Sequence, residues 1–369
     1  MSSTTPRLAT EVALTSDQLE ALELARLPGR LFLSGRPRTG KTTVLQHLLA
    51  TLLLDGHRPD RILVLLPQRL PIARYERALV RALAGTGAPT RGGVDAATFY
   101  GLCRRWVALY WPLVAEAAGF AHPEREPVFL TIETAQYFMW RIVEPLVARK
   151  GYFSELRVLR ERLLSQLLDN LNKSALVGFP HTEVGERLAR AWTGGGDRPL
   201  HYRQAQECAI LFREYCLEHG LLDLSLTCEL ARCHLLANPR FLADLSGRYR
   251  WLLVDNLEEN VPAAHDFIRL LMAYCEGAVL AMDTGGGYRV FLGADAEGAW
   301  ELGGTCDRSL HLHRSVWGGG GVPRLAEAIT GALGADASPD GDGAGASDVR
   351  ATGVAQGSGQ YWIGMVRWV

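Results

Sequence analysis

The sequence predicts an α/β fold in which helices cover both faces of a parallel sheet, with a helical insertion and a glycine-rich C-terminal tail. In residues 1–120, buried apolar runs alternate with amphipathic helical stretches, and the same alternation returns in residues 248–316. This alternation is typical of parallel sheets covered by helices. Residues 121–247 carry helical periodicity, and residues 317–369 have the composition of a linker or disordered tail. We therefore expect one α/β domain built from two separate segments of the chain.

Five apolar runs have the length and composition of buried strands. They are RLFLSG (30–35), RILVLLP (61–67), VDAATF (94–99), YRWLLVDN (249–256) and AVLAMD (278–283). Helical patterns follow the first three: residues 41–56, ended by Gly56, a stretch to about residue 84, and residues 100–120. A short turn therefore connects the first expected strand directly to a helix.

The composition excludes a membrane span, but it does not decide what the local cluster of arginines does. The 369 residues are 48% hydrophobic and 21% charged, with a net charge of −1, which is ordinary for a soluble globular protein. No apolar run reaches the roughly 20 residues that span a bilayer. The N-terminus lacks the basic and apolar regions of a signal peptide, so a cytoplasmic location is expected.

Residues 58–105 hold nine arginines and three acidic residues, which indicates either a phosphate-binding face or a solvated surface.

The turn after the first expected strand has the pattern GxxxxGK[ST], from Gly35 to Thr42. Its glycines let the backbone N–H groups face phosphate oxygens, and the following helix adds its positive N-terminal end. Lys41 would reach the β- and γ-phosphates, and the Thr42 hydroxyl would ligate Mg²⁺. With a strand before it and a helix after it, the turn predicts binding of ATP and Mg²⁺. The residues expected to contact the nucleotide are Gly35, Arg38, Thr39, Gly40, Lys41, Thr42 and Thr43.

The other half of such a site is an acidic residue at the end of a neighbouring strand, which holds Mg²⁺ beside a carboxylate that activates water. Asp255 ends the expected strand in WLLVDNLEEN and is the predicted partner of Thr42 at the metal. The next residue is Asn256, whose amide cannot accept a proton. The sequence therefore predicts nucleotide binding with impaired hydrolysis.

Seven segments, taken in order, resemble the UvrD/Rep group of superfamily 1 DNA helicases. They are LTSDQLEAL (14–22), GRPRTGKTT (35–43), ILVLLPQRLPIARYERAL (62–79), TFYGLC (98–103), the stretch 220–260 that ends in WLLVDNLEEN, VLAMDTGGGYRVFLGAD (279–295) and Arg314-Ser315. The order and spacing carry the resemblance, since each segment after the phosphate loop is weak alone. It implies a RecA-like domain 1A whose helical insertion is the family's domain 1B.

The resemblance also implies roles for residues outside the phosphate loop. Gln18 would read adenine, and Arg314 would be a catalytic arginine at the γ-phosphate beside Lys41 and Asp255. Single-stranded DNA would lie on residues from the third and fourth of these segments and on two arginines next to them. These are Gln68, Thr98, Phe99, Tyr100, Arg104 and Arg105. The alternative is that Phe99 belongs to the core and the arginines are solvated.

Departures from the family pattern predict a degenerate module. The family's DEFQD sequence is Asp255-Asn256-Leu257-Glu258-Glu259 here, so an amide stands in place of the catalytic glutamate. The glutamine that senses γ-phosphate is replaced by Gly286, and the arginine that follows it by Leu292. The residues after Ser315 are too few for the family's second RecA-like domain, so a complete helicase is not expected.

Three functions remain open at this point. The first is an ATP-binding helicase module that contacts single-stranded DNA in repair or recombination, with weak or absent hydrolysis. The second is a scaffold subunit of a helicase–nuclease or repair complex, in which ATP is structural. The third is a P-loop kinase for a small molecule, which is disfavoured because no lid-like arginine segment is recognisable. ATP turnover with and without single-stranded DNA separates the first two.

Overall fold

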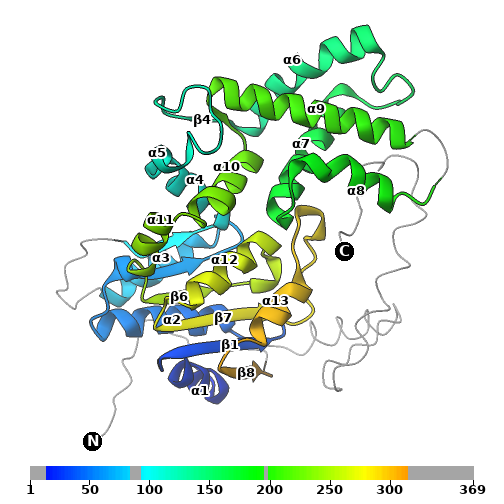
Figure 1. Ribbon diagram of the computed structural model, residues 1–369. Helices are drawn as coiled ribbons and strands as arrows, with labels where there is room; N and C mark the ends of the chain where they lie inside the picture. The colour runs from blue at the N-terminus through cyan, green and yellow to red at the C-terminus, as the bar shows by residue number, and fades with distance from the viewer. Residues whose placement is uncertain (1–13, 84–92, 195–197, 315–369) are drawn as a thin grey trace, which may run out of the picture.

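The computed structural model describes residues 14–83, 93–194 and 198–314, and its centre is a six-stranded sheet (Figure 1). All paired strands in it run parallel, in the order β3-β2-β6-β7-β1-β8. Its strands are β1 (Gly29–Gly35), β2 (Ile62–Leu65), β3 (Asp95–Ala97), β6 (Trp251–Val254), β7 (Gly277–Asp283) and β8 (Arg308–Leu312). The predicted fold class, a parallel sheet in an α/β architecture, is confirmed.

Helices cover both faces of this sheet and form a further group above it in Figure 1. The helices along the α/β part are α1 (Ser16–Ala25), α2 (Lys41–Leu54), α3 (Ile72–Leu83), α4 (Phe99–Leu109), α5 (Trp111–Val114), α12 (Pro262–Met272) and α13 (Ala296–Gly303). Those of the inserted segment are α6 (Ile132–Lys150), α7 (Arg160–Val177), α8 (Val184–Ala191), α9 (Arg198–His219), α10 (Leu224–Leu230) and α11 (Pro239–Ser246). None of the helices in the described parts of the chain is long and apolar enough to cross a membrane.

Successive strand residues feed two separate hydrophobic cores, because side chains alternate between the faces of a sheet. In β1, Leu31 and Leu33 pack with α1 and α2, whereas Phe32 packs on the opposite face. In β6, Trp251 and Leu253 pack in the same core as Leu31 and Leu33. Strands buried on both faces read as continuous apolar runs, which is why the sequence pattern identified them.

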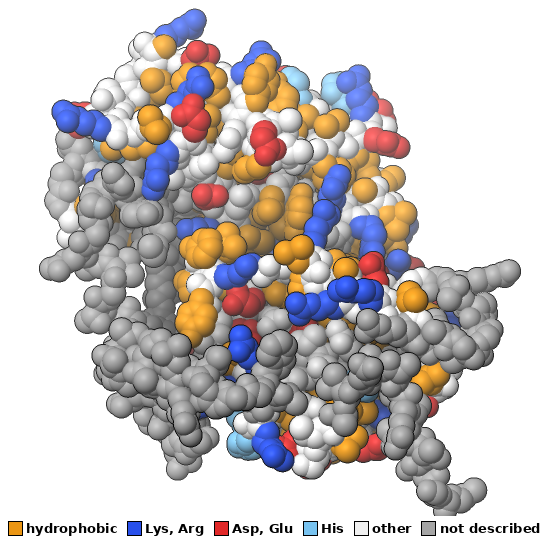
Figure 2. Space-filling view, turned by 180° about the vertical axis from the view of Figure 1, so that it is seen from behind, with side chains coloured by type: hydrophobic (Ala, Val, Ile, Leu, Met, Phe, Trp, Pro, Cys, Tyr) orange, Lys and Arg blue, Asp and Glu red, His pale blue; other side chains and the backbone are white. Residues whose placement is uncertain are grey.

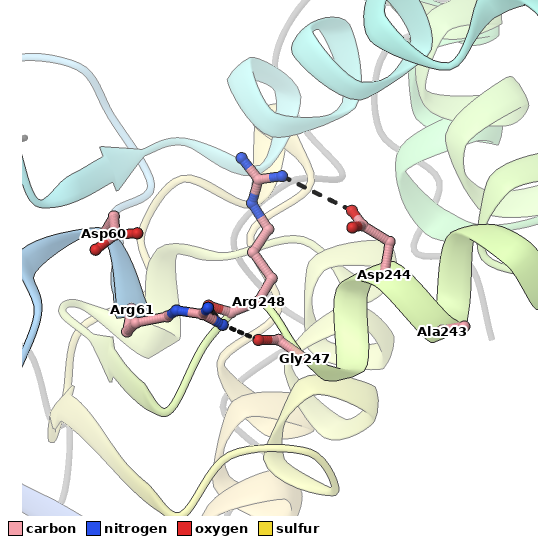
Figure 3. A pocket seen from close by; sticks show the side chains of 6 residues that line it. All are labelled: Asp60, Arg61, Ala243, Asp244, Gly247 and Arg248. Carbon is pink, nitrogen blue, oxygen red and sulfur yellow. Dashed lines mark hydrogen bonds and ion pairs between the residues drawn. The ribbon is translucent and has the colours of Figure 1, made fainter.

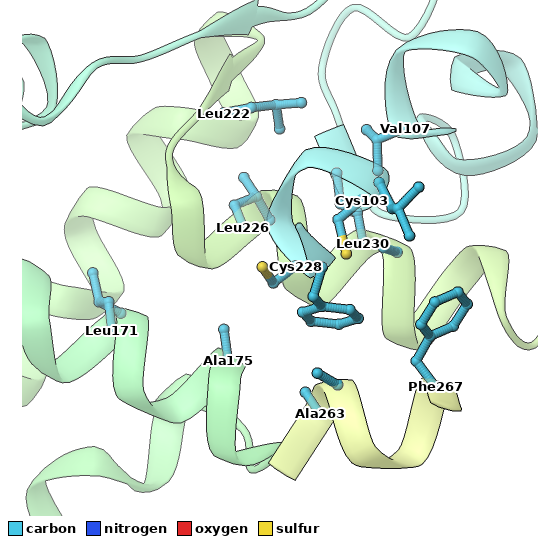
Figure 4. Close-up of a cluster of buried hydrophobic side chains, with 14 of the residues drawn as sticks. Cys103, Val107, Leu171, Ala175, Leu222, Leu226, Cys228, Leu230, Ala263 and Phe267 are labelled. Carbon is cyan, nitrogen blue, oxygen red and sulfur yellow. The ribbon is translucent and has the colours of Figure 1, made fainter. Parts of the chain in front are cut away.

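The other core, which contains Phe32, runs without interruption from the sheet into the inserted helices. Figure 4 shows its centre, where α4, α7, α10 and α12 converge. Cys103 and Val107 of α4 meet Cys228 of α10, Ala175 of α7 and Phe267 of α12 there. The insertion is therefore packed directly on one face of the α/β part, and the boundaries expected near residues 120 and 247 stay predictions.

Three local expectations are wrong. The single helix expected over 100–120 is broken between α4 and α5, with Pro112 in the first turn of α5, where its missing N–H is tolerated. The inserted segment, expected to lack strands, contains the short parallel pair β4 (Val128–Phe129) and β5 (Leu221–Leu222). Strand β8 was not expected, because its half-buried residues give no apolar run. The tail predicted for 317–369 and Ser315 lie outside the described residues.

Candidate functional site

The predicted phosphate loop connects the end of β1 to the start of α2 and takes a conformation that needs glycine. Gly40 precedes α2 in the left-handed region, with a φ of 92°. A Cβ atom on Gly35 would lie 2.7 Å from the Leu312 carbonyl oxygen and 2.9 Å from Thr39 Oγ1, so a side chain does not fit. Arg38 also has a positive φ, of 69°, which a non-glycine residue rarely adopts. The loop thus has the strand–turn–helix context of the P-loop.

Lys41 is buried beneath this loop and bonded to four oxygen atoms. Its Nζ donates to the carbonyl oxygens of Gly35 (2.6 Å) and Arg36 (2.8 Å) and to Thr39 Oγ1 (3.1 Å). It also forms an ion pair of 2.6 Å with Asp283 Oδ1. Only 5% of the Lys41 side chain is exposed. Phosphate oxygens would therefore have to replace some of these partners.

Asp283 reaches Lys41 because β7 is the parallel neighbour of β1, and their register pairs Asp283 with Gly35. The next residue strengthens the connection, since the Thr284 N–H donates to the Gly35 carbonyl oxygen at 2.9 Å. The end of β7 is thus bonded to the phosphate loop by one ion pair and one backbone hydrogen bond. The sequence analysis did not single out Asp283, although it ends a buried strand just as Asp255 does.

The predicted metal pair, Thr42 and Asp255, is in contact. Thr42 Oγ1 donates to Asp255 Oδ1 at 3.2 Å and to Oδ2 at 3.0 Å. The hydroxyl of Tyr75 on α3 donates to the same Oδ2 at 2.9 Å. Burial raises the pKa of Asp255, and the Asp283 charge adds to this, whereas the hydrogen bonds from Tyr75 and Thr42 oppose it. Burial, with the Asp255 charge, also holds the pKa of Tyr75 well above its usual value.

These residues fit a magnesium ion. Mg²⁺ prefers oxygen ligands and is usually held by one or two carboxylates together with substrate phosphates and water. Thr42 and Asp255 offer a hydroxyl and a carboxylate at the N-terminus of α2, on the side of the loop where phosphates would lie. Within the described ranges no three His, Cys, Asp or Glu side chains form a cluster that could hold a metal alone. A nucleotide's phosphates would have to complete the coordination.

The residues after Asp255 hold a buried carboxylate in place. Asn256 has a φ of 53° and donates through Nδ2 to Glu258 Oε1 at 3.2 Å. Glu258 Oε2 accepts from the Asp283 backbone N–H at 2.9 Å, which joins the ends of β6 and β7. Burial raises the pKa of Glu258 to about 7. The Asn256 amide is therefore engaged with Glu258, and both oxygens of Glu258 accept hydrogen bonds.

The remaining predicted nucleotide contacts lie around the loop, and some are engaged in the fold. Gln18, on α1, donates through Nε2 to the Thr39 carbonyl oxygen at 2.9 Å and accepts from the Thr15 N–H at 3.1 Å. Thr43 is half-buried in the first turn of α2. Arg314 is exposed, two residues beyond the carboxyl end of β8, at the edge of the sheet that carries the loop.

Three of the predicted DNA contacts belong to the start of α4. Thr98 caps this helix by accepting from the Gly101 N–H at 3.1 Å. Phe99 is buried in the core and packs against Phe267, with ring centroids 5.9 Å apart. Tyr100 is half-buried against the same core. Gln68 is half-buried in the loop after β2, the strand that pairs with β3 just before Thr98. The structure therefore gives Thr98 and Phe99 internal contacts, and their DNA role stays a prediction.

Three arginines of the basic segment contact other parts of the protein. Arg105 pairs with Asp95 through two hydrogen bonds of 2.8 and 2.5 Å, and Arg104 lies 4.9 Å from the centre of the Phe129 ring. Arg61 lies at the amino ends of the strands, opposite the phosphate loop, where it donates to the Gly247 carbonyl oxygen. Figure 3 shows the hollow at this edge, lined by Asp60, Arg61, Ala243, Asp244, Gly247 and Arg248. Its arginines bond to neighbouring protein groups.

An exposed apolar segment follows β7 on the loop side of the sheet. Four of its residues expose more than half of their surface: Tyr288, Val290, Phe291 and Leu292. Arg289 among them lies 3.7 Å from Glu259. Figure 2 shows hydrophobic (orange) and basic (blue) side chains next to each other across the middle of the rear face. The sequence analysis considered Leu292 only as a missing arginine, because sequence alone does not reveal which apolar residues stay exposed.

A P-loop between β1 and α2, with Asp255 at the end of the parallel strand β6, which β7 separates from β1, defines the class: the chain has a P-loop NTPase fold. No protein-family model and no curated protein matches the chain. Among solved structures, it is similar to "Bacterial conjugative coupling protein TrwBdeltaN70", in its unbound monoclinic form. The identity is 13%, over 80% of this chain and 71% of that one, with a TM-score of 0.26. At that score the fold assignment rests on the chain's own sheet and loop.

Proposed function

We propose that the chain binds ATP and Mg²⁺ as a UvrD/Rep-like module, contacts single-stranded DNA and hydrolyses ATP slowly or not at all. The contact that carries the proposal is the one between Thr42 and Asp255, at 3.0 and 3.2 Å. It joins the end of the phosphate loop to the end of β6, where a metal bound to nucleotide phosphates would need both side chains. Lys41 lies next to this pair and supplies the positive charge.

Slow hydrolysis follows from the contacts around Asn256. The position expected to hold the catalytic base carries an amide, and that amide donates to Glu258. Glu258 itself accepts two hydrogen bonds and is almost fully buried. Neither side chain is arranged to take a proton from a water molecule. Since a positioned general base contributes about 10²–10⁴-fold to rate, ATP should bind and persist.

Support for a nucleic-acid ligand comes from the segment 288–292 rather than from the start of α4. Exposed aromatic side chains next to an arginine are suited to stacking on unpaired bases. Tyr288 and Phe291 are such residues, with Arg289 between them. The same exposed apolar group also fits the second function, a scaffold subunit, because protein interfaces use similar patches.

Calorimetric titration of ATP with Mg²⁺ tests nucleotide binding, and phosphate release tests hydrolysis. We expect saturable binding and turnover near the uncatalysed background, with or without single-stranded DNA. Asn256→Glu should raise turnover by about tenfold at most, because its carboxylate would face Glu258 and because Gly286 and Leu292 still replace the family's glutamine and arginine. Robust DNA-stimulated turnover by the unmutated chain would refute the degenerate site.

A fluorescence titration with a labelled single-stranded oligonucleotide tests the DNA ligand. Binding in the presence of ATP and Mg²⁺ should weaken as salt rises, since phosphate contacts release counterions. Tyr288→Ala combined with Phe291→Ala should weaken it by about tenfold or more, at about 1–3 kcal/mol for each stacked base. Lack of binding at low salt would favour the scaffold function instead.

A further inference from the structure

The hydroxyl of Tyr75 is the feature of the site that neither the phosphate loop nor the metal pair requires. Tyr75 lies on α3, which packs against α2, and its side chain is fully buried in the core on that face of the sheet. A phenylalanine ring would fill the same space without bringing a polar atom into the core. A buried hydroxyl costs free energy unless it is bonded. Here its partner is Asp255, through the 2.9 Å hydrogen bond to Oδ2.

The geometry at Asp255 indicates what this bond does. Rotation of a carboxylate about its last side-chain bond is only weakly restricted in aspartate. Thr42 donates to both oxygens from the α2 side, and Tyr75 donates to Oδ2 from α3. The two donors, on separate helices, fix the plane of the carboxylate. Oδ2 accepts from both donors, and Oδ1 accepts the longer bond from Thr42.

We propose that Tyr75 is a positioning residue for the metal: it holds the Asp255 carboxylate in the orientation in which it meets Mg²⁺ bound to nucleotide phosphates. The proposal rests on the proposed binding of ATP and Mg²⁺. Residues that hydrogen-bond to metal-ligating groups orient those groups, and their mutation typically costs about 10–100-fold in metal affinity. Tyr75 thus contributes to the Mg²⁺-dependent part of nucleotide affinity without touching the nucleotide.

The test is the Mg²⁺ dependence of ATP binding in Tyr75→Phe, measured by calorimetry with Mg²⁺ and with EDTA. We expect ATP affinity in EDTA to stay within about twofold of the unmutated chain, because Lys41 and the loop are untouched. The enhancement of affinity by Mg²⁺ should fall by about tenfold or more. A tenfold higher Mg²⁺ concentration should then restore much of the loss, whereas a purely structural defect would not respond to the metal.

Tyr249→Phe is the matched control. Tyr249 immediately precedes Arg250 and β6, so it lies at the opposite end of the strand from Asp255, and its buried hydroxyl donates to Asp95. Removing that hydroxyl changes a tyrosine–aspartate bond of the same kind far from the loop. We expect this variant to keep the Mg²⁺ enhancement of the unmutated chain.

The outcomes separate this inference from the proposed function. If the unmutated chain fails to bind ATP with Mg²⁺, both are wrong. If it binds and Tyr75→Phe shows the same Mg²⁺ enhancement, or loses affinity equally with and without metal, the positioning role alone is wrong. Should Tyr75→Phe not fold, Tyr75→Met removes the same hydroxyl with a flexible side chain. Failure of both to fold, while Tyr249→Phe folds, would assign the hydroxyl to core stability and overturn the inference.

Discussion

The two halves of the proposed nucleotide site differ in how their residues are engaged. In the metal half, Thr42 and Asp255 already make the contact that a bound magnesium ion would need, and Tyr75 holds the carboxylate from the other side. In the phosphate half, Lys41 is committed to two carbonyl oxygens, a hydroxyl and the Asp283 carboxylate. The metal half is therefore organised in advance, whereas the phosphate half must exchange partners when phosphate binds.

This difference implies that the affinity of the site for a nucleotide depends on competition for Lys41. Phosphate oxygens compete there with the protein oxygens that already bind the lysine. Phosphate gains the Lys41 charge only by displacing groups that already bind it, so part of the interaction energy is spent on that exchange. The carboxylate of Asp283 would also be left facing the phosphates. A Mg²⁺ ion held by the metal half would offset this repulsion between Asp283 and the phosphates.

Removing the lysine should have the largest effect. Lys41→Ala is expected to weaken ATP binding by about 100-fold or more, since hydrogen bonds to a charged group contribute about 1.5–3 kcal/mol each. Calorimetry measures the loss. Lys150→Ala is the matched control, because Lys150 is exposed on α6 and pairs with Glu207 at 3.3 Å. Affinity of Lys41→Ala close to that of the control would refute the P-loop assignment.

Releasing the lysine from its carboxylate should act in the opposite direction. Asp283→Asn keeps the backbone N–H that bonds to Glu258 but removes the charge that holds Lys41. ATP should bind about tenfold more tightly, which corresponds to about 1.4 kcal/mol. Asp60→Asn, which removes an exposed partner of Arg58, should have no effect. Weaker binding by Asp283→Asn would mean that Asp283 takes part in holding the metal rather than in competing with phosphate.

A pH dependence should come from Glu258, which joins the two halves. Its pKa of about 7 in the folded chain exceeds the ordinary glutamate value, so the folded state holds the proton more tightly than the unfolded state. This stability is present at low pH and is lost as pH rises through 7, by about 1 kcal/mol between pH 6 and 8. Glu258→Gln cannot ionise, and Asn256 can rotate its amide to bond with it.

Urea unfolding at pH 6 and at pH 8 measures this effect in both proteins. The change in unfolding free energy between the two pH values should be smaller by about 1 kcal/mol in Glu258→Gln than in the unmutated chain. An identical pH dependence in the two proteins would show that Glu258 is ionised throughout the range.

The smallest expected effect belongs to Gln18. Both ends of its amide are bonded, to the Thr39 carbonyl oxygen and to the Thr15 N–H, so the side chain connects α1 to the phosphate loop. If it reads adenine, Gln18→Ala should weaken ATP binding by about threefold to tenfold and leave GTP binding unchanged, as loss of one or two neutral hydrogen bonds implies. If its role is to hold the loop, ATP and GTP affinities should fall together. Parallel titrations with the two nucleotides distinguish these outcomes.

Sequence reasoning succeeded where the signal is local and failed where it is not. The phosphate loop was predictable because glycine positions, a preceding strand and a following helix lie within a few residues of each other. Asp255 was predictable because it ends a continuous apolar run. Tyr75 was not, since a tyrosine on an amphipathic helix has no local sign of a distant partner, and its bond to Asp255 spans 180 residues. Exposure of Tyr288 and Phe291 likewise depends on what packs around them.

The sequence by itself therefore determined the class of fold and the conformation of the loop, because strand burial and glycine conformation follow from residue types and their spacing. Only the tertiary structure decided how the site is held. The register of β1 and β7 places Asp283 against Lys41, and the packing of α3 on α2 brings Tyr75 to Asp255. These contacts join residues far apart along the chain, so they are fixed by the order of strands in the sheet and the packing of helices upon it.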